Sequence, residues 1–334
     1  MHDRVSGRPT GHAALAFFED QHPPAGDFLA DVLDGFSRSP KQLAPVYFYD
    51  AAGSAIFDEI THLPEYYVTR TELSILDRIG PELATLAGPG AVVIEPGSGS
   101  SVKVRKLLDA LPDPAAYVGL DISGDHLKAA CLEIAGAYPD MQVGAVCADF
   151  TQGLELAHLP LDDGKRVIFF PGSTVGNFEP DGARRLLAGF RRAMRPGDAV
   201  LIGADRVKDP ARLVAAYDDA LGVTARFNLN LIHRINRELD GSIDPDGLSH
   251  RAVWNTDRAR IEMHLVAERA QAFEISGRPF HLHVGESIHT ENSHKFTQES
   301  FTSLAESVGF TVRSSWSDDA ELFSLHWLEP TAKA

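Results

Sequence analysis

Apolar and polar positions in the middle of the chain form short apolar runs separated by longer segments with helical spacing. The runs that predict buried strands are 91–95, 116–121, 142–149, 166–172 and 199–205. The segments that predict helices between them are 101–111, 124–137 and 181–194. Strands that alternate with helices of this length require crossover connections. The pattern therefore predicts an α/β fold with a mostly parallel sheet and helices on both faces.

The pattern changes on both sides of this region. Residues 27–36 have helical spacing, and Thr69 and Glu72 are spaced as a capping box at the start of another helix. Further along, residues 209–239 predict two helices, and the alternating segments that follow predict an antiparallel meander. We expect the last helix, at 297–308, and the two strands after it to close the first sheet.

Composition and charge exclude several classes of partner. The net charge of -16 argues against nucleic acid or an anionic membrane as the main partner. No apolar run approaches the roughly 18 residues that would span a bilayer, and the N-terminal residues do not resemble a secretory signal. The two cysteines, Cys131 and Cys147, give no disulfide framework. We expect a cytoplasmic protein that acts on a small molecule.

A glycine turn follows the first predicted strand, in the sequence "EPGSGSSVK". Glycines allow a ligand to approach the backbone, and parallel sheets bind ligands at the carboxyl ends of their strands. Ser100 stands where a P-loop would need lysine, and Val102 replaces the third glycine of a dinucleotide fingerprint. The remaining ligand-binding interpretation is the E-x-G-x-G turn of S-adenosylmethionine-dependent methyltransferases; an ordinary tight turn is the alternative.

Polar residues at the ends of the next two strands favour the methyltransferase interpretation. Asp121 ends the second predicted strand, where an acid would bind the ribose hydroxyls of the cofactor. Asp149 and Phe150 follow the third strand, where a polar residue would contact the adenine. The sequence therefore predicts a cofactor site at one edge of the sheet.

Histidines suggest a function of another class. His281 and His283 alternate on one predicted strand and so face the same side, and His289 and His294 follow soon after. A metal-binding protein that uses His281 and His283 is therefore an alternative, whereas the methyltransferase interpretation has no metal ion.

Four separated blocks carry a closer resemblance: "VYFYDAAGSAIFDEITHLPEYYVTRTE", "FFPGSTVGNF", "VKDPARLVAAYDDALGVTARFN" and "TENSHKF". Together they resemble the ergothioneine-pathway histidine Nα-methyltransferases, from about residue 27 to 328. The resemblance implies a Rossmann-like class I methyltransferase core and a second α+β domain formed from both flanks. We assign the core to 71–207 and 296–330 and the substrate-binding domain to 15–70 and 208–295. Residues 1–14 are expected to be flexible.

The resemblance also implies roles for individual residues. Those implied to bind S-adenosylmethionine are Tyr49, Gly97, Gly99, Lys103, Asp121, Asp149 and Phe150. Those implied to bind the amino acid are Tyr66, Asn177, Tyr217, Met263, Glu291 and Ser293, with Tyr49 and Asn177 in catalytic roles. One departure is Pro96, where family members often carry another apolar residue. Each residue also has a structural alternative: a core tyrosine, a helix cap for Asn177, a surface lysine for Lys103, or core filling for Met263.

The implied reaction is methyl transfer to the α-amine of L-histidine, repeated three times to give a trimethylated betaine. The amine must lose its proton before each transfer, and positioning of nitrogen and methyl supplies most of the acceleration. In an extended segment Glu291 and Ser293 face the same side and offer an acceptor and a donor to an imidazole ring. Another amino acid or amine, such as tryptophan, is the alternative substrate. We expect a monomer.

Overall fold

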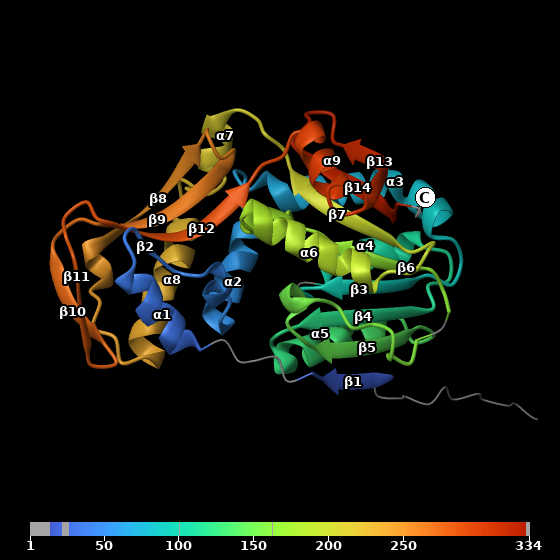
Figure 1. Cartoon of the computed structure of the whole chain (residues 1–334), viewed down its shortest axis with the longest axis horizontal. Coiled ribbons are helices and arrows are strands. Elements are labelled where there is room, and N and C mark those ends of the chain that lie inside the picture. The colour runs from blue at the N-terminus through green and yellow to red at the C-terminus, as the bar shows by residue number, and fades with distance from the viewer. Residues whose placement is uncertain (1–13, 22–26, 100, 162, 332–334) are drawn as a thin grey trace, which may run out of the picture.

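An eight-stranded sheet forms the main body of the computed structural model, which describes residues 14–21, 27–99, 101–161 and 163–331 (Figure 1). The strand order is β1-β5-β4-β3-β6-β7-β14-β13. The strands are β1 Phe17–Asp20, β3 Val92–Pro96, β4 Ala116–Asp121, β5 Gln142–Cys147, β6 Arg166–Phe170, β7 Ala199–Asp205, β13 Phe310–Ser317 and β14 Phe323–Pro330. Strands β1 to β7 of this sheet pair in parallel, and β14 pairs antiparallel with both β7 and β13.

Helices cover both faces of this sheet. They are α3 Tyr67–Ala87, α4 Val102–Ala110, α5 Gly124–Ala137, α6 Pro180–Ala193 and α9 Gln298–Glu306. Side chains of β3 alternate between two apolar clusters: Val93 packs in the cluster that includes α3, α4 and α5, whereas Val92 and Ile94 pack with α6 and α9. The predicted mostly parallel α/β fold is confirmed, including the return of the C-terminal strands to the sheet.

A second sheet lies beside the first, on the left of Figure 1. Its strand order is β2-β12-β9-β8, and a separate hairpin is formed by β10 and β11. The strands are β2 Lys41–Gln42, β8 Leu248–Asn255, β9 Arg260–Ala267, β10 Gln271–Ile275, β11 Arg278–Leu282 and β12 Ser287–His294. Its helices are α1 Phe28–Ser37, α2 Ala51–Thr61, α7 Pro210–Ala215 and α8 Val223–Glu238. Short 3-10 turns are η1 Pro45–Phe48, η2 Phe150–Gln152, η3 Thr174–Asn177 and η4 Pro245–Gly247.

Two segments that connect the sheets lie side by side. The chain leaves the first sheet after β7 and returns after β12, and Arg206 forms an isolated parallel bridge with Phe296. The Phe296 N–H donates to the Asp205 carbonyl at 2.9 Å. Beneath this crossing, the buried Asp205 carboxylate pairs with Lys295 at 2.7 Å and Lys208 at 2.6 Å. This arrangement places the end of β12 next to the carboxyl end of β7.

Two expectations about the N-terminal part were wrong. Strand β1 pairs in parallel with β5, so residues 17–20 belong to the large sheet rather than to the flanking domain. Helix α3 begins at Tyr67, and Thr69 lies inside it rather than capping it. Glu72, the other residue of the expected box, is fully buried and accepts from the Gly172 N–H at 3.0 Å. The rest of the domain division stays a prediction, and residues 1–13 lie outside the described residues.

None of the helices in the described part of the chain is long and apolar enough to cross a membrane.

Candidate active site

The glycine turn after β3 has the conformation that its sequence requires. Gly97 adopts a φ of 75°, which side-chain-bearing residues rarely tolerate. Its N–H donates to the Leu120 carbonyl at 2.7 Å, which ties the turn to β4. A Cβ on Gly97 would lie 3.6 Å from the Phe150 ring, whereas one on Gly99 would meet nothing within 4 Å. The turn therefore presents bare backbone beside an aromatic ring.

Glu95, the acid of the E-x-G-x-G turn, belongs to a buried hydrogen-bonded group beside the turn. Glu95 is buried and accepts from the Tyr117 hydroxyl at 2.7 Å, and Tyr117 is in turn 2.7 Å from the Ser98 hydroxyl. Burial raises the pKa of Glu95 to about 7, although the Tyr117 bond and Lys103 oppose this rise. Glu95 is thus linked to the side chain of Ser98 in the turn through the Tyr117 hydroxyl.

Two further carboxylates end the neighbouring strands. Asp121 ends β4, accepts from the Ser123 N–H at 2.8 Å, and has its pKa raised by burial. Asp149 caps η2 and accepts from the N–H of Thr151 at 2.9 Å. Because β3, β4 and β5 are adjacent and parallel, Gly97, Asp121 and Asp149 lie at one edge of the sheet.

Lys103 is largely buried, so it is not the exposed surface lysine that was the alternative to a cofactor-binding role. Its ammonium pairs with the buried Glu72 carboxylate at 2.7 Å, and only 17% of its side chain is exposed. Glu72 also holds the Gly172 N–H after β6. Lys103 therefore joins α3, α4 and the loop after β6 next to the glycine turn; a contact with the cofactor stays a prediction.

A hydrogen-bonded group of side chains lies where β12 approaches β7. The Tyr217 hydroxyl is 2.8 Å from the Ser293 hydroxyl. The Lys295 ammonium donates to both of them, at 2.9 Å and 2.8 Å, and also pairs with Asp205. Burial alone would lower the pKa of Lys295 and raise that of Asp205, but their mutual attraction more than compensates, so both remain charged.

Glu291 lies on the same side of β12 as Ser293, because it pairs with the buried Met263 of β9. Burial raises the pKa of the Glu291 carboxyl to about 7, although Lys295 opposes the rise. The Asn177 side-chain amide, from η3, lies 3.4 Å from a Glu291 oxygen and so makes a long hydrogen bond at most. The Glu291 carboxyl therefore has no short hydrogen bond among the described side chains that would compensate for its burial, and it is available as an acceptor.

Three tyrosines line the same region. The rings of Tyr66 and Tyr217 meet edge to face with centroids 6.3 Å apart. The Phe57 ring lies between the other pair: its centroid is 6.2 Å from that of Tyr66 and 5.6 Å from that of Tyr49. Burial is the largest cause that raises the pKa of the Tyr66 and Tyr217 hydroxyls, and Glu291 adds to it. Tyr49 keeps 45% of its surface exposed, whereas Tyr66 keeps 8%. The structure thus brings together all the residues predicted to bind the amino acid.

Comparison with known proteins identifies the chain. Residues 28–330 match the model of the histidine-specific, S-adenosylmethionine-dependent methyltransferases. The chain belongs to this family. It is 41% identical over 301 residues to the histidine N-alpha-methyltransferase of Mycolicibacterium smegmatis, covering 88% of this chain and 92% of that protein. It is 40% identical over 324 residues to the protein of the same name from Mycobacterium tuberculosis, covering 96% of each.

A third relative connects the family to a pathway. The ergothioneine biosynthesis protein 1 of Neurospora crassa is 30% identical over 296 residues, which are 86% of this chain and 33% of that longer protein. The chain is therefore a methyltransferase that uses S-adenosylmethionine, as the glycine turn and the four sequence blocks predicted.

The residues at the strand ends fit this cofactor. The bare backbone at Gly97 leaves room that a Cβ would fill, and the Phe150 ring lies beside it. Asp121 offers a carboxylate oxygen for ribose hydroxyls. The described polar and aromatic groups at this edge therefore match the chemistry of a nucleoside ligand in this methyltransferase.

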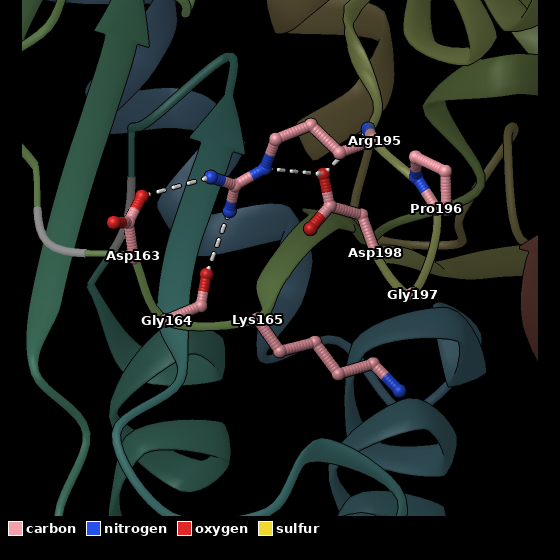
Figure 2. A pocket seen from close by; sticks show the side chains of 7 residues that line it. All are labelled: Asp163, Gly164, Lys165, Arg195, Pro196, Gly197 and Asp198. Atoms are coloured by element: carbon pink, nitrogen blue, oxygen red, sulfur yellow. Dashed lines mark hydrogen bonds and ion pairs between the residues drawn. The ribbon is translucent and has the colours of Figure 1, made fainter.

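A hollow elsewhere in the methyltransferase has a structural explanation. It lies beside the loops that precede β6 and β7, at the amino ends of these strands, and Figure 2 shows its lining side chains. The Arg195 guanidinium is occupied there by the Gly164 carbonyl at 2.8 Å and by Asp163 and Asp198 at 3.5 Å and 3.6 Å. These groups satisfy one another and lie at the end of the sheet opposite to the glycine turn.

The two histidines of the rival interpretation lie on the outer hairpin. The rings of His281 and His283 meet edge to face with centroids 4.8 Å apart, and they line a surface hollow with Lys41. Within the described residues they do not join a third potential ligand into a group that could hold a metal ion. Together with membership in the methyltransferase family, this leaves the rival interpretation without support.

Proposed function

We propose that this protein transfers methyl groups from S-adenosylmethionine to the α-amine of L-histidine, three times in succession, for ergothioneine biosynthesis. The observation that carries the proposal is the polar face of β12, where Glu291 and Ser293 stand beside Tyr217 and Met263. An acceptor and a hydroxyl donor on one face can hold the two nitrogens of an imidazole ring. The 40–41% identical relatives named as histidine N-alpha-methyltransferases support this choice of substrate.

S-adenosylmethionine, when bound, supplies an electrophilic methyl carbon on a sulfonium. Gly97, Asp121, Asp149 and Phe150 would hold its nucleoside part at the strand ends. Tyr49 is the residue that would lie between the cofactor and the substrate.

Asn177 and the tyrosines would orient the amino acid. Because their pKa values are raised, Tyr49, Tyr66 and Tyr217 stay protonated near neutral pH. They therefore act as hydrogen-bond donors and aromatic walls rather than as bases, and the proton of the amine leaves to solvent water. Aromatic rings also stabilise a quaternary ammonium group by cation–π attraction, which suits repeated methylation.

The direct test is incubation of the purified protein with S-adenosylmethionine and each of the twenty amino acids, followed by mass spectrometry. We expect L-histidine to be preferred and to gain up to three methyl groups on its α-nitrogen. Preferential methylation of tryptophan, or of an imidazole nitrogen, would contradict the proposal.

Variants separate the two halves of the site. Glu291→Gln and Ser293→Ala should each raise KM for histidine at least tenfold while leaving the affinity for S-adenosylmethionine, measured by calorimetry, unchanged. Equal loss of both affinities would remove these residues from the substrate site. The cytoplasmic location and the monomeric state remain predictions.

A further inference from the structure

Three potential metal ligands gather on the second sheet, apart from the residues assigned to methyl transfer. One ligand atom from each of Glu262, His264 and His289 lies within 4.8 Å of the others. The two imidazole rings are stacked, with centroids 4.8 Å apart and planes 20° apart. All three residues are partly buried, so their positions are constrained by the sheet.

A β-bulge puts this group on the face opposite to Glu291. His289 pairs with His264, and Glu291 pairs with Met263, with a register shift between them. Neighbouring residues on β9 point to opposite faces, so His264 and Met263 do so as well. The extra residue in β12, Thr290, therefore turns His289 and Glu291 to opposite sides although they are two positions apart.

Hydrogen bonds fix the histidine that belongs to β12. The His289 Nε2 lies 2.9 Å from the Glu291 carbonyl oxygen, and since a carbonyl only accepts, Nε2 carries the proton. The lone pair of His289 is therefore on Nδ1. A backbone carbonyl that holds the second nitrogen of an imidazole is the usual support of a metal-binding histidine.

His264 and Glu262 each have one polar atom in contact with a neighbouring side chain and a second polar atom that faces the group. The His264 Nδ1 is 3.4 Å from the Ser287 hydroxyl, and its Nε2 is 3.4 Å from Oε2 of Glu262. Oε1 of Glu262 accepts from Arg260 at 2.7 Å and Asn255 at 2.9 Å, which leaves Oε2 toward the histidines.

The charges around the group permit a cation. Two arginines lie close to the group. Arg260 contacts Glu179 at 2.6 Å and Glu262 at 2.7 Å, so its charge is shared between two carboxylates. Arg251 stands opposite His264 on the neighbouring strand β8. A neutral imidazole ring has one nitrogen lone pair that can bind a metal ion.

We propose that Glu262, His264 and His289 form a binding site for a divalent transition-metal ion of the zinc type. Two imidazoles and one carboxylate are a ligand set of zinc, whereas magnesium and calcium prefer oxygen alone. Ligand atoms of a tetrahedral zinc are roughly 3.3 Å apart, so ligand atoms that now lie up to 4.8 Å apart must approach one another by up to about 1.5 Å around the ion. A bound ion would cross-link β9 and β12 directly behind Glu291. The proposal is independent of the substrate assignment.

The test is a titration of the full-length, tag-free protein with Co²⁺ in the absence of histidine, which itself chelates metals. We expect saturable visible absorption typical of a tetrahedral site, with one ion per chain, and displacement of Co²⁺ by Zn²⁺. His264→Gln and His289→Gln should each weaken Co²⁺ binding at least tenfold. The more conservative Glu262→Gln should do the same and keeps the proposal testable if a histidine variant fails to fold.

The matched control is the double variant His281→Gln and His283→Gln, which removes two histidines in edge-to-face contact from the neighbouring hairpin. It should leave the absorption and the affinity unchanged. Loss of binding in this control but not in the His264 variant would place the ion on the hairpin and overturn the proposal. Absence of saturable Co²⁺ binding by the unaltered protein would overturn it as well.

Discussion

Replacing Glu291 by glutamine should stabilise the substrate-free protein at alkaline pH. Burial raises the pKa of this carboxyl from 4.5 to about 7. At about 1.36 kcal/mol per pKa unit, the ionised carboxylate costs the folded state about 3 kcal/mol. This figure is an upper limit, because the residue is only partly buried.

The sign of the effect follows from proton binding. Below pH 4.5 the carboxyl is protonated in both the folded and the unfolded state, so the substitution has no electrostatic effect. Between pH 4.5 and 7 the folded state keeps the proton and the unfolded state loses it, so the stability of the unaltered protein falls as pH rises. Glutamine has no charge to bury, so Glu291→Gln should gain stability relative to the unaltered protein across this range.

The assay is urea unfolding of both proteins at pH 4.5 and pH 8, without substrate. We expect similar midpoints at pH 4.5 and a higher midpoint for Glu291→Gln at pH 8. Glu274→Gln, on an exposed position of β10, is the control and should show no such pH dependence. A difference between the proteins that is the same at both pH values, or a less stable variant at pH 8, would refute the reasoning.

Three further substitutions test other contacts. Lys295→Met should raise KM for histidine at least tenfold in steady-state kinetics. It should also lower the free energy of unfolding by about 3 kcal/mol in urea, because Asp205 loses a buried partner. Gly97→Ala should weaken S-adenosylmethionine binding in calorimetry, because a Cβ would enter the space beside the Phe150 ring, and it should destabilise the folded protein by about 1–2 kcal/mol, because a φ of 75° is strained for alanine. Asp121→Ala should weaken the affinity for S-adenosylmethionine at least tenfold, whereas Asp125→Ala, at the exposed start of α5, should leave it unchanged. Equal affinities of the two variants for S-adenosylmethionine would argue against the ribose contact.

The sequence predicted those parts of the fold in which a local pattern and the tertiary structure agree. The strands at 91–95 and 116–121 are apolar because both faces of the sheet are covered, and they became β3 and β4. The carboxylate at Asp121 was predictable for the same reason, because a polar residue directly after such a run must lie at a strand end.

Features that depend on distant contacts were not predictable. Glu72 has the spacing of a capping residue, but it is buried against Lys103 and Gly172 instead. Strand β1 has only four residues, and its pairing with β5 leaves no local signal. Lys295 stood within the quoted block "TENSHKF", yet a lysine beside a histidine-rich strand gives no sign of complete burial.

On the proposed function, the hydrogen bonds of Lys295 would make one face of β12 selective for a neutral imidazole. An ammonium group has three hydrogens, and Lys295 uses them on Asp205, Tyr217 and Ser293. Because the Tyr217 and Ser293 hydroxyls also bond to each other, one of them spends its hydrogen within the pair, and one O–H remains for a ligand.

That single donor, together with the Glu291 acceptor, matches a ring with one lone pair and one N–H. A protonated imidazole has two N–H groups and no acceptor, so it would leave the remaining hydroxyl without a partner. An indole has one N–H and no lone pair, and it fails for the same reason. On the proposed function, therefore, the discrimination comes less from the two residues that touch the ring than from the buried lysine that fixes how many hydrogens they can offer.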